Sequence, residues 1–209
     1  MIEPFVFLIA LAYLLGSVPF GVLIATAHGK DLRSIGSGNI GATNVARALG
    51  KKWAYVCFVL DCLKGLIPML IARLFVRELT VVVLSLWLAV GCAAILGHIF
   101  PIYLRFKGGK GVATSLGVVL GLYPYYTVPG IIAIIIWAGV VLIWRYISLA
   151  SITAAVAFPI SLIVSIAVFG EWRLAQLWPL IIVALVMGLL CLLYTSPSPR
   201  DLSTSRMPS

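Results

Sequence analysis

The chain has 209 residues, of which 63% are hydrophobic and only 10% are charged, and it carries a formal net charge of +9. A soluble domain needs roughly a quarter of its residues charged, so this composition excludes an ordinary soluble protein. The long continuous apolar runs also exclude a membrane β-barrel, whose strands alternate polar and apolar residues.

Seven apolar segments are predicted to form helices, and in chain order they span residues 4–27, 52–76, 79–98, 112–123, 127–144, 149–169 and 174–194. A helix of about 20 residues crosses the ~30 Å hydrocarbon core of a bilayer. The fourth segment is short, and it fits either a half-span or a tilted helix flanked by buried loop. We therefore expect an all-α fold, a polytopic integral membrane bundle of about seven transmembrane helices formed by one domain, residues 1–194.

The two ends of the chain need separate readings. The first segment ends in Ala25-Thr26-Ala27, which resembles a signal-peptide cleavage site, but Glu3 precedes it without any Lys or Arg and the apolar run is long. We expect it to be retained as a first span. Residues 195–209 are mostly Ser, Thr, Pro and Arg without apolar periodicity, and we expect a non-native or disordered tail.

Basic residues are distributed unevenly between the two ends of the predicted spans. With the N-terminus outside, only Arg73, Arg77 and Arg173 fall in outer loops. The cytoplasmic loops then hold Lys30, Arg33, Arg47, Lys51, Lys52, Arg105, Lys107, Lys110 and Arg145. This bias predicts that the polar loops face the cytoplasm. Topology and an anionic membrane surface account for most of the net charge, so we expect membrane lipids and no nucleic acid as partners.

The first polar loop, residues 28–51, has the composition of an anion-binding loop. Gly36, Gly38 and Gly41 permit positive φ and close approach to a ligand. Successive amides in such a turn bind anions, more strongly where a helix follows, and Arg47 can bind phosphate through two parallel hydrogen bonds. The side chains that can donate or accept hydrogen bonds are Ser37, Asn39, Thr43 and Asn44. Taken alone, the pattern also fits a flexible polar linker.

The second polar loop, residues 99–111, brings two lysines next to glycines. Lys107 and Lys110 flank Gly108 and Gly109, and Gly111 precedes a segment compatible with helix. Ammonium groups and free amides at a helix N-terminus form a phosphate or oxyanion site. The G-x-x-x-x-G-K-[ST] motif is absent, so ATP hydrolysis is not implied. The lysines also fit a simpler role as cytoplasmic topology anchors.

Four other polar residues stand out, and three of them, His98, Lys64 and Ser148, are candidates for the site. His98, at the cytoplasmic end of the third span, could accept a proton near neutral pH or serve only in packing. Asp61 and Lys64 are three residues apart inside the second span and share a helix face. A buried charge needs a partner, so they form a structural pair or Lys64 faces a ligand. Ser148 could contribute a hydroxyl to the site or cap a helix.

Three stretches, Gly16–Gly21, Gly36–Arg47 and Gly97–Thr114, resemble the bacterial acyl-phosphate:glycerol-3-phosphate acyltransferases, which are small integral membrane enzymes. Asp61–Gly65 and Ser148–Ile152 are similar to the family as well, so the resemblance covers residues 1 to about 194. After that point the tail stands where the family has a third cytoplasmic motif containing His, Asn and Glu.

The resemblance implies a seven-helix enzyme of the bacterial inner membrane. It would transfer a fatty acyl group from acyl phosphate to the 1-hydroxyl of sn-glycerol 3-phosphate, giving lysophosphatidic acid and inorganic phosphate. Ser37 and Arg47 match essential polar positions of the family's first motif, and Lys107–Gly111 match its glycerophosphate-binding loop. Lys64, Thr114 and Ser148 join these as binding candidates. We expect a monomer with its active site toward the cytoplasm.

An acyl phosphate is an activated mixed anhydride, so we expect no metal, no cofactor and no covalent acyl-enzyme. The glycerol hydroxyl would attack directly, with Arg47, Lys107, Lys110 and loop amides holding the charge. Its proton would pass to a substrate phosphate oxygen or to His98. The main alternative is a transporter for an organic phosphate or another anion, in which short helices and Gly-rich loops also occur. Against it, the sequence shows no convincing internal repeat.

Overall fold

The computed structural model describes residues 2–145, 147–170 and 172–194. Within these ranges every regular element is an α-helix or a 3-10 turn, which confirms the predicted all-α fold. The expected tail, residues 195–209, lies outside the described residues. Its assignment as non-native or disordered therefore stays a prediction.

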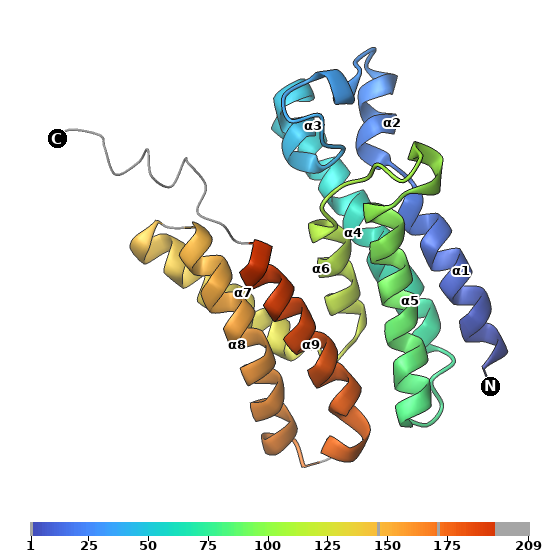
Figure 1. The fold of residues 1–209 in the computed structure, drawn as a ribbon, viewed down its shortest axis with the longest axis vertical. Coiled ribbons are helices and arrows are strands. Elements are labelled where there is room, and N and C mark those ends of the chain that lie inside the picture. The colour runs from blue at the N-terminus through green and yellow to red at the C-terminus, as the bar shows by residue number, and fades with distance from the viewer. Residues whose placement is uncertain (1, 146, 171, 195–209) are drawn as a thin grey trace. The chain divides into compact units, whose positions relative to one another are not determined.

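The chain forms two compact units, Met1–Leu122 and Tyr123–Ser209. The first unit contains α1 (Glu3–Ser17), α2 (Phe20–Ala27), η1 (Leu32–Ser34), α3 (Ala42–Leu49), α4 (Lys51–Arg73), α5 (Val81–Ile99), η2 (Ile102–Leu104) and α6 (Val112–Gly121). Here α1 packs along α5, α6 packs along α4, and α3 contacts α4 (Figure 1). The second unit contains α7 (Thr127–Trp144), α8 (Ile147–Val168) and α9 (Leu174–Tyr194), with α8 contacting both of its neighbours.

Five helical stretches among the described residues are long and apolar enough to cross a membrane: Glu3–Ala27, Lys51–Arg73, Val81–Leu104, Thr127–Trp144 and Leu149–Val168. Two shorter apolar helices, Val112–Gly121 and Leu174–Leu189, account for the other predicted spans. The ten residues of α6 rise by only ~15 Å, about half of the hydrocarbon core. The prediction of a helical membrane protein is confirmed, while the number of full crossings and the orientation stay predictions.

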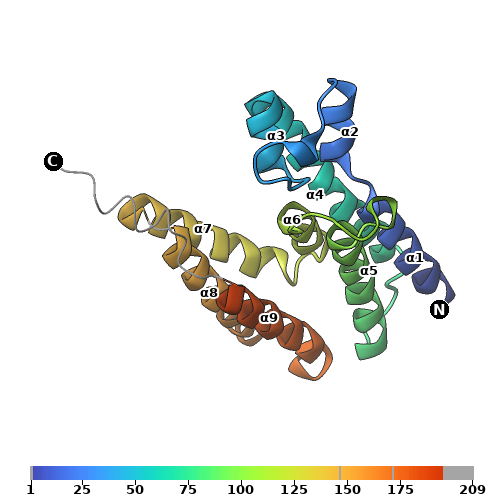
Figure 2. The ribbon, with the colours of Figure 1, turned by 45° about the horizontal axis from the view of Figure 1, so that its top comes forward.

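The first predicted span is not continuous but breaks between α1 and α2 at Val18 and Pro19. Proline has no backbone N–H and disfavours helical geometry in the preceding residue, and Val18 is extended, with φ −62° and ψ 117°. The carbonyl of Val18, released from the helical ladder, accepts a hydrogen bond from Lys64 Nζ at 2.9 Å. The break therefore supplies a part-buried acceptor to α4; Figure 2 shows α1 and α2 as separate helices.

Residues 20–57 form a cap over one end of the first unit. A buried apolar cluster joins α2, η1, α3 and the start of α4; its members are Ala25, Leu32, Val45, Ala48 and Cys57. Lys30 Nζ donates a hydrogen bond to the carbonyl of Ala48 near the end of α3, where a cation also suits the helix dipole. The cap holds the first polar loop in a defined conformation, which a flexible linker would not have.

Glycines let the helices of the first unit approach each other at backbone distance. A Cβ on Gly117 of α6 would overlap the carbonyl of Cys62 on α4, and a Cβ on Gly65 would overlap the carbonyl of Thr114. Small residues at such interfaces are the usual means by which membrane helices pack closely. The position of α6 against α4 depends on these two contacts.

We expect Gly117→Ala to lower the thermal unfolding midpoint in detergent by about 5 °C, because overpacking costs ~1–3 kcal/mol. The matched control is Gly139→Ala in α7, where an added Cβ meets nothing within 4 Å. A midpoint for Gly117→Ala equal to that of the control would contradict the close packing of α4 and α6. Scanning fluorimetry of both variants beside the parent chain measures the difference.

Candidate functional site

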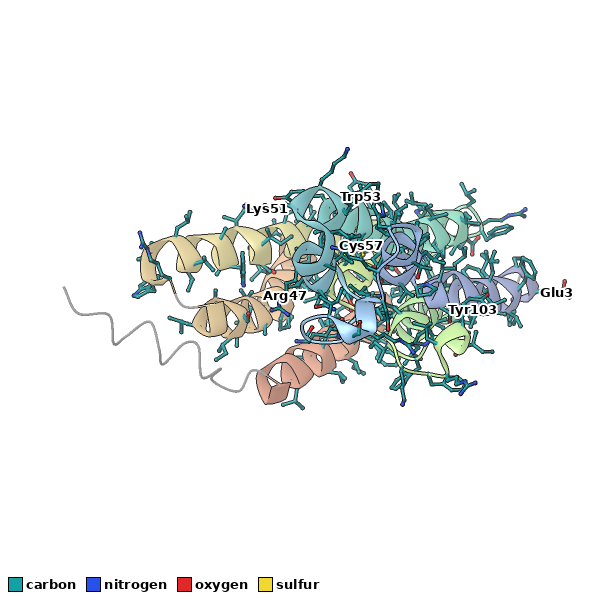
Figure 3. The ribbon with its side chains drawn as sticks, turned by 90° about the horizontal axis from the view of Figure 1, so that it is seen from above. Glu3, Arg47, Lys51, Trp53, Cys57 and Tyr103 are labelled. Carbon is teal, nitrogen blue, oxygen red and sulfur yellow. The ribbon has the colours of Figure 1, made fainter. Side chains whose placement is uncertain are left out.

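A cavity of about 450 Å³ lies in the first unit where the two polar loops meet. Its lining residues are Ser37, Asn39, Gly41, Ala42, Thr43, Asn44, Arg47, Phe58, Asp61, His98, Lys110, Gly111, Val112 and Ala113. They come from both polar loops, from the starts of α3 and α6, from α4 and from the end of α5. Figure 3 views the molecule from above, with Arg47 of α3 and Cys57 of α4 labelled.

Asn44 organises the first loop from a buried position in the first turn of α3. Its Nδ2 donates to the carbonyls of Leu32 and Ile35, both at 2.9 Å, and its Oδ1 accepts from the amide of Ser37 at 3.2 Å. These bonds use both amide protons. Asn44 therefore borders the cavity mainly as a scaffold. The only hydrogen-bonding capacity that its side chain still offers a ligand is a second bond to Oδ1.

The N-terminus of α3 is directed at the cavity. Gly41 caps the helix, and its amide donates to Asn39 Oδ1 at 2.9 Å, so Asn39 serves as a turn residue. Among the described residues, the amides of Ala42 and Thr43 have no hydrogen-bond acceptor. Free amides at a helix start can bind anions, and anion binding by the first loop stays a prediction.

Arg47 follows one turn later on the same helix, and its side chain passes close to Gly36. A Cβ on Gly36 would lie 3.1 Å from Arg47 Cδ and 2.5 Å from Asn44 Oδ1, and Gly36 also has φ +57°. Glycine at this position thus allows both the turn and the path of the arginine. Arg47 is exposed and forms no ion pair with any described carboxylate.

The second loop folds back onto the end of α5. The amide of Gly108 donates to the carbonyl of Ile99, and the amide of Gly109 donates to the carbonyl of His98, both at 3.1 Å. A Cβ on Gly108 would overlap those carbonyls, and one on Gly109 would overlap the His98 ring. The two glycines predicted to bind substrate are therefore needed first for this close contact.

The loop ends at Gly111, whose φ of +79° begins α6. Lys110, Gly111, Val112 and Ala113 all line the cavity, and the amides of Val112 and Ala113 have no acceptor within the described ranges. The starts of α3 and α6 thus meet at one cavity, beside the exposed side chain of Lys110. Lys107 is also exposed but is not among the lining residues.

Three buried ionisable side chains lie beneath the loops. Lys64 Nζ is 2.8 Å from Asp61 Oδ1, and His98 Nδ1 is 3.8 Å from the same oxygen. Asp61, Lys64 and His98 are 3%, 5% and 4% exposed. The pairing of Asp61 with Lys64 matches one of the two open alternatives, and Lys64 is not among the cavity residues. Such a pair is stable at this depth only because each charge has the other as partner.

Of the remaining candidates, Thr114 is not among the residues that line the cavity. Thr114 is fully buried, and its Oγ1 donates to the carbonyl of Asp61 at 3.0 Å. Ser148 belongs to the first turn of α8 in the second unit, and its side chain lies outside the described part of the structure.

The structure brings together at one cavity the predicted residues Ser37, Asn39, Gly41, Thr43, Asn44, Arg47, His98, Lys110 and Gly111. It adds Phe58 and Asp61 of α4, which sequence reasoning did not place in the site. The carboxylate inside an apolar span was the available signal for Asp61. For Phe58 no signal existed, because one aromatic residue in an apolar helix is ordinary.

Comparison with known proteins gives one consistent result. A model of the family described as glycerol-3-phosphate acyltransferase matches residues 6–202. The glycerol-3-phosphate acyltransferase of Geotalea daltonii is 54% identical over 149 residues, which cover 71% of this chain and 72% of that protein. The corresponding protein of Aquifex aeolicus is 50% identical over 152 residues, covering 72% and 75%.

Solved structures agree with these matches. The crystal structure of PlsY (YgiH), an integral membrane glycerol 3-phosphate acyltransferase, in its glycerol 3-phosphate form is 40% identical, with a TM-score of 0.72. The match covers 98% of this chain and 94% of that chain. The lysophosphatidic acid form of the same protein gives a TM-score of 0.71 with equal coverage.

Proposed function

We propose that this chain, which belongs to the glycerol-3-phosphate acyltransferase family, transfers a fatty acyl group from an acyl phosphate to the 1-hydroxyl of sn-glycerol 3-phosphate. The products are lysophosphatidic acid and inorganic phosphate. The observation that carries the proposal is that two helix starts and two cations, Arg47 and Lys110, face one cavity. Such a cavity suits two phosphate groups held side by side.

The reaction needs little from the protein beyond positioning and charge stabilisation. The 1-hydroxyl oxygen attacks the acyl carbon and forms the ester bond, while the bond between that carbon and the phosphate oxygen breaks. The hydroxyl proton passes to an oxygen of the departing phosphate or to His98, which borders the cavity. Holding both substrates in attack geometry and stabilising the tetrahedral oxyanion account for the rate.

The residues divide into two groups by position. Arg47, the hydroxyl of Ser37 and the α3 amides form one wall of the cavity, and Lys110 with the α6 amides forms another. Lys107 is assigned to bind a substrate phosphate as an exposed cation of the second loop. We assign the anionic groups of the two substrates to these two walls.

A direct assay tests the proposal. Purified protein is incubated with glycerol 3-phosphate and palmitoyl phosphate, and phosphate release and lysophosphatidic acid are followed together. Equal amounts of both products from acyl phosphate, with none from palmitoyl-CoA, are expected. Uptake of glycerol 3-phosphate into proteoliposomes without conversion would instead support an anion transporter, and an acyl adduct on Ser37 in mass spectra would rule out direct attack.

For the orientation, we infer a monomer in the bacterial inner membrane with its N-terminus outside and its cavity toward the cytoplasm. The first unit carries Lys51 and Lys52 at the start of α4, and Arg73 and Arg77 at or just beyond its other end. Most of the basic residues belong to the cap, residues 20–57, or to the second loop, residues 99–111. Both lie at the end of the first unit where α4 starts, away from the N-terminus (Figure 1). This distribution follows the positive-inside rule.

Cysteine labelling checks that orientation. In intact spheroplasts, a membrane-impermeant maleimide should label Arg77→Cys and leave Lys51→Cys unlabelled until the membrane is permeabilised. The unsubstituted chain gives the background from its own four cysteines. Labelling of Lys51→Cys in intact spheroplasts would invert the proposed topology.

A further inference from the structure

The network beneath the cavity contains a carboxylate that the proposed reaction does not use. Asp61 borders the cavity although it is only 3% exposed. Lys64 balances its charge at 2.8 Å and is itself bonded to the carbonyl of Val18. The thiol of Cys57 donates to Asp61 Oδ2 at 3.6 Å. Lys64 alone is enough to balance the charge of Asp61. The contacts of Asp61 with residues next to the second loop are therefore not explained by the ion pair.

On that side, Asp61 contacts the two elements that carry the second loop. Its backbone carbonyl accepts the hydrogen bond from Thr114 at the start of α6. Its Oδ1 faces His98 Nδ1 at the end of α5, 3.8 Å away. The opposite edge of the His98 ring lies against Gly109, since a Cβ there would overlap Nε2. A continuous series of contacts therefore runs from Asp61 through His98 to Gly109 of the second loop.

The middle of this path is not fully bonded. Asp61 Oδ1 and His98 Nδ1 are buried, and neither has a hydrogen bond among the described residues. The contact of Oδ1 with Lys64 is thus an ion pair rather than an aligned hydrogen bond. Buried polar atoms without hydrogen bonds are unfavourable, and a movement of about 1 Å would bring these two within hydrogen-bond distance. The other edge of the His98 ring lies against Gly109, so such a movement would change the contact between His98 and the second loop.

We propose that Asp61 is a positioning residue for glycerol 3-phosphate. Through His98 it sets the position of the amides and lysines of residues 107–111, and the Asp61–His98 hydrogen bond closes when substrate occupies that loop. Lys64 balances the charge of the buried carboxylate and ties it to the break between α1 and α2. The inference rests on the proposed function, because it assigns the second loop to glycerol 3-phosphate.

The test separates positioning from folding by removing both charges together. Asp61→Asn alone leaves Lys64 buried without its counter-charge and can unfold the protein. The double variant Asp61→Asn/Lys64→Met leaves no unpaired charge and is expected to keep the parent melting temperature. Its KM for glycerol 3-phosphate should rise about tenfold, the effect of replacing a hydrogen bond to a charged carboxylate by a weaker one to a neutral amide oxygen. Its KM for palmitoyl phosphate should stay within about twofold.

A third substitution tests the path through the ring. His98→Gln should raise the same KM, and adding it to the double variant should cause no further rise, because the two changes break one path. A matched control is Cys57→Ala, which removes the thiol that donates to Asp61 Oδ2 without changing His98 and should leave both KM values unchanged.

Three results would overturn the inference: an unchanged KM for glycerol 3-phosphate in the folded double variant, equal rises for both substrates, or effects that multiply when His98→Gln is added. If the parent chain forms no lysophosphatidic acid, the proposed function fails. The inference is then read from the rise of the melting temperature with glycerol 3-phosphate. The double variant should need about tenfold more ligand than the parent for the same rise.

Discussion

Replacing Arg47 with alanine should lower kcat/KM for acylation of glycerol 3-phosphate by about 10²–10³-fold, the range found when a donor that stabilises a developing oxyanion is removed. Arg47 borders the cavity, is exposed and has no carboxylate partner in the described part of the chain. Its charge is therefore available to a substrate, and its loss removes two parallel hydrogen bonds at once. Arg47→Lys should restore only a small part of the rate, because an ammonium group cannot form that pair.

The matched control is Lys51→Ala at the start of α4, a few residues from Arg47 along the chain (Figure 3). Lys51 is exposed and is not a cavity residue, so its removal changes net charge equally without changing the site. Steady-state assays of the three variants and the parent chain give the comparison. A parent-like rate in Arg47→Ala would remove Arg47 from the mechanism and leave phosphate binding to the loop amides and lysines.

Gly109→Ala should reduce activity by about 10²-fold, although it adds only one methyl group. The new Cβ would overlap His98 Nε2 and would also lie 3.0 Å from Cε1 and 3.1 Å from Cδ2. The ring is 4% exposed, so the loop has to move instead. A displacement of about 1 Å at a binding element can cost about 10²-fold in rate. The loss should appear mainly in KM for glycerol 3-phosphate.

Phe106→Ala is the control within the same loop, because its side chain is 59% exposed and its removal adds no atoms. It should keep the parent KM. Circular dichroism and the melting temperature are measured for both variants, since overpacking alone costs ~1–3 kcal/mol. An active Gly109→Ala with unchanged KM would show that the contact between the loop and His98 has no functional role.

Several features of the protein could be read directly from local sequence. The helical segments follow from runs of apolar residues, because a residue's preference for lipid does not depend on its distant neighbours. The start of α6 directly after Gly111 was also predictable, because the second loop precedes a segment compatible with helix. By contrast, α3 was not predicted: residues 28–51 were expected to form a polar loop, and the structure places the helix Ala42–Leu49 within it.

Other features depend on partners that are remote in sequence. Asn44 was expected to face a ligand, but its side-chain Nδ2 donates to the carbonyls of Leu32 and Ile35, which are 12 and 9 residues earlier in the chain. Lys64 could not be told from a ligand-binding lysine until its second partner, the carbonyl of Val18, was known. Gly108 and Gly109 were assigned to substrate, whereas their closest contact is the end of α5.

The sequence by itself thus determined the membrane class, most of the helical segments, the two glycine-rich polar loops and the family. Each of these depends on composition or on short-range patterns. Only the tertiary structure decided that both loops share one cavity, that α1 and α2 are separate helices, and that Asp61 lies below the site between Lys64 and His98. Those facts depend on how closely the helices pack. The distance between two packed helices is set by the side chains of both helices together.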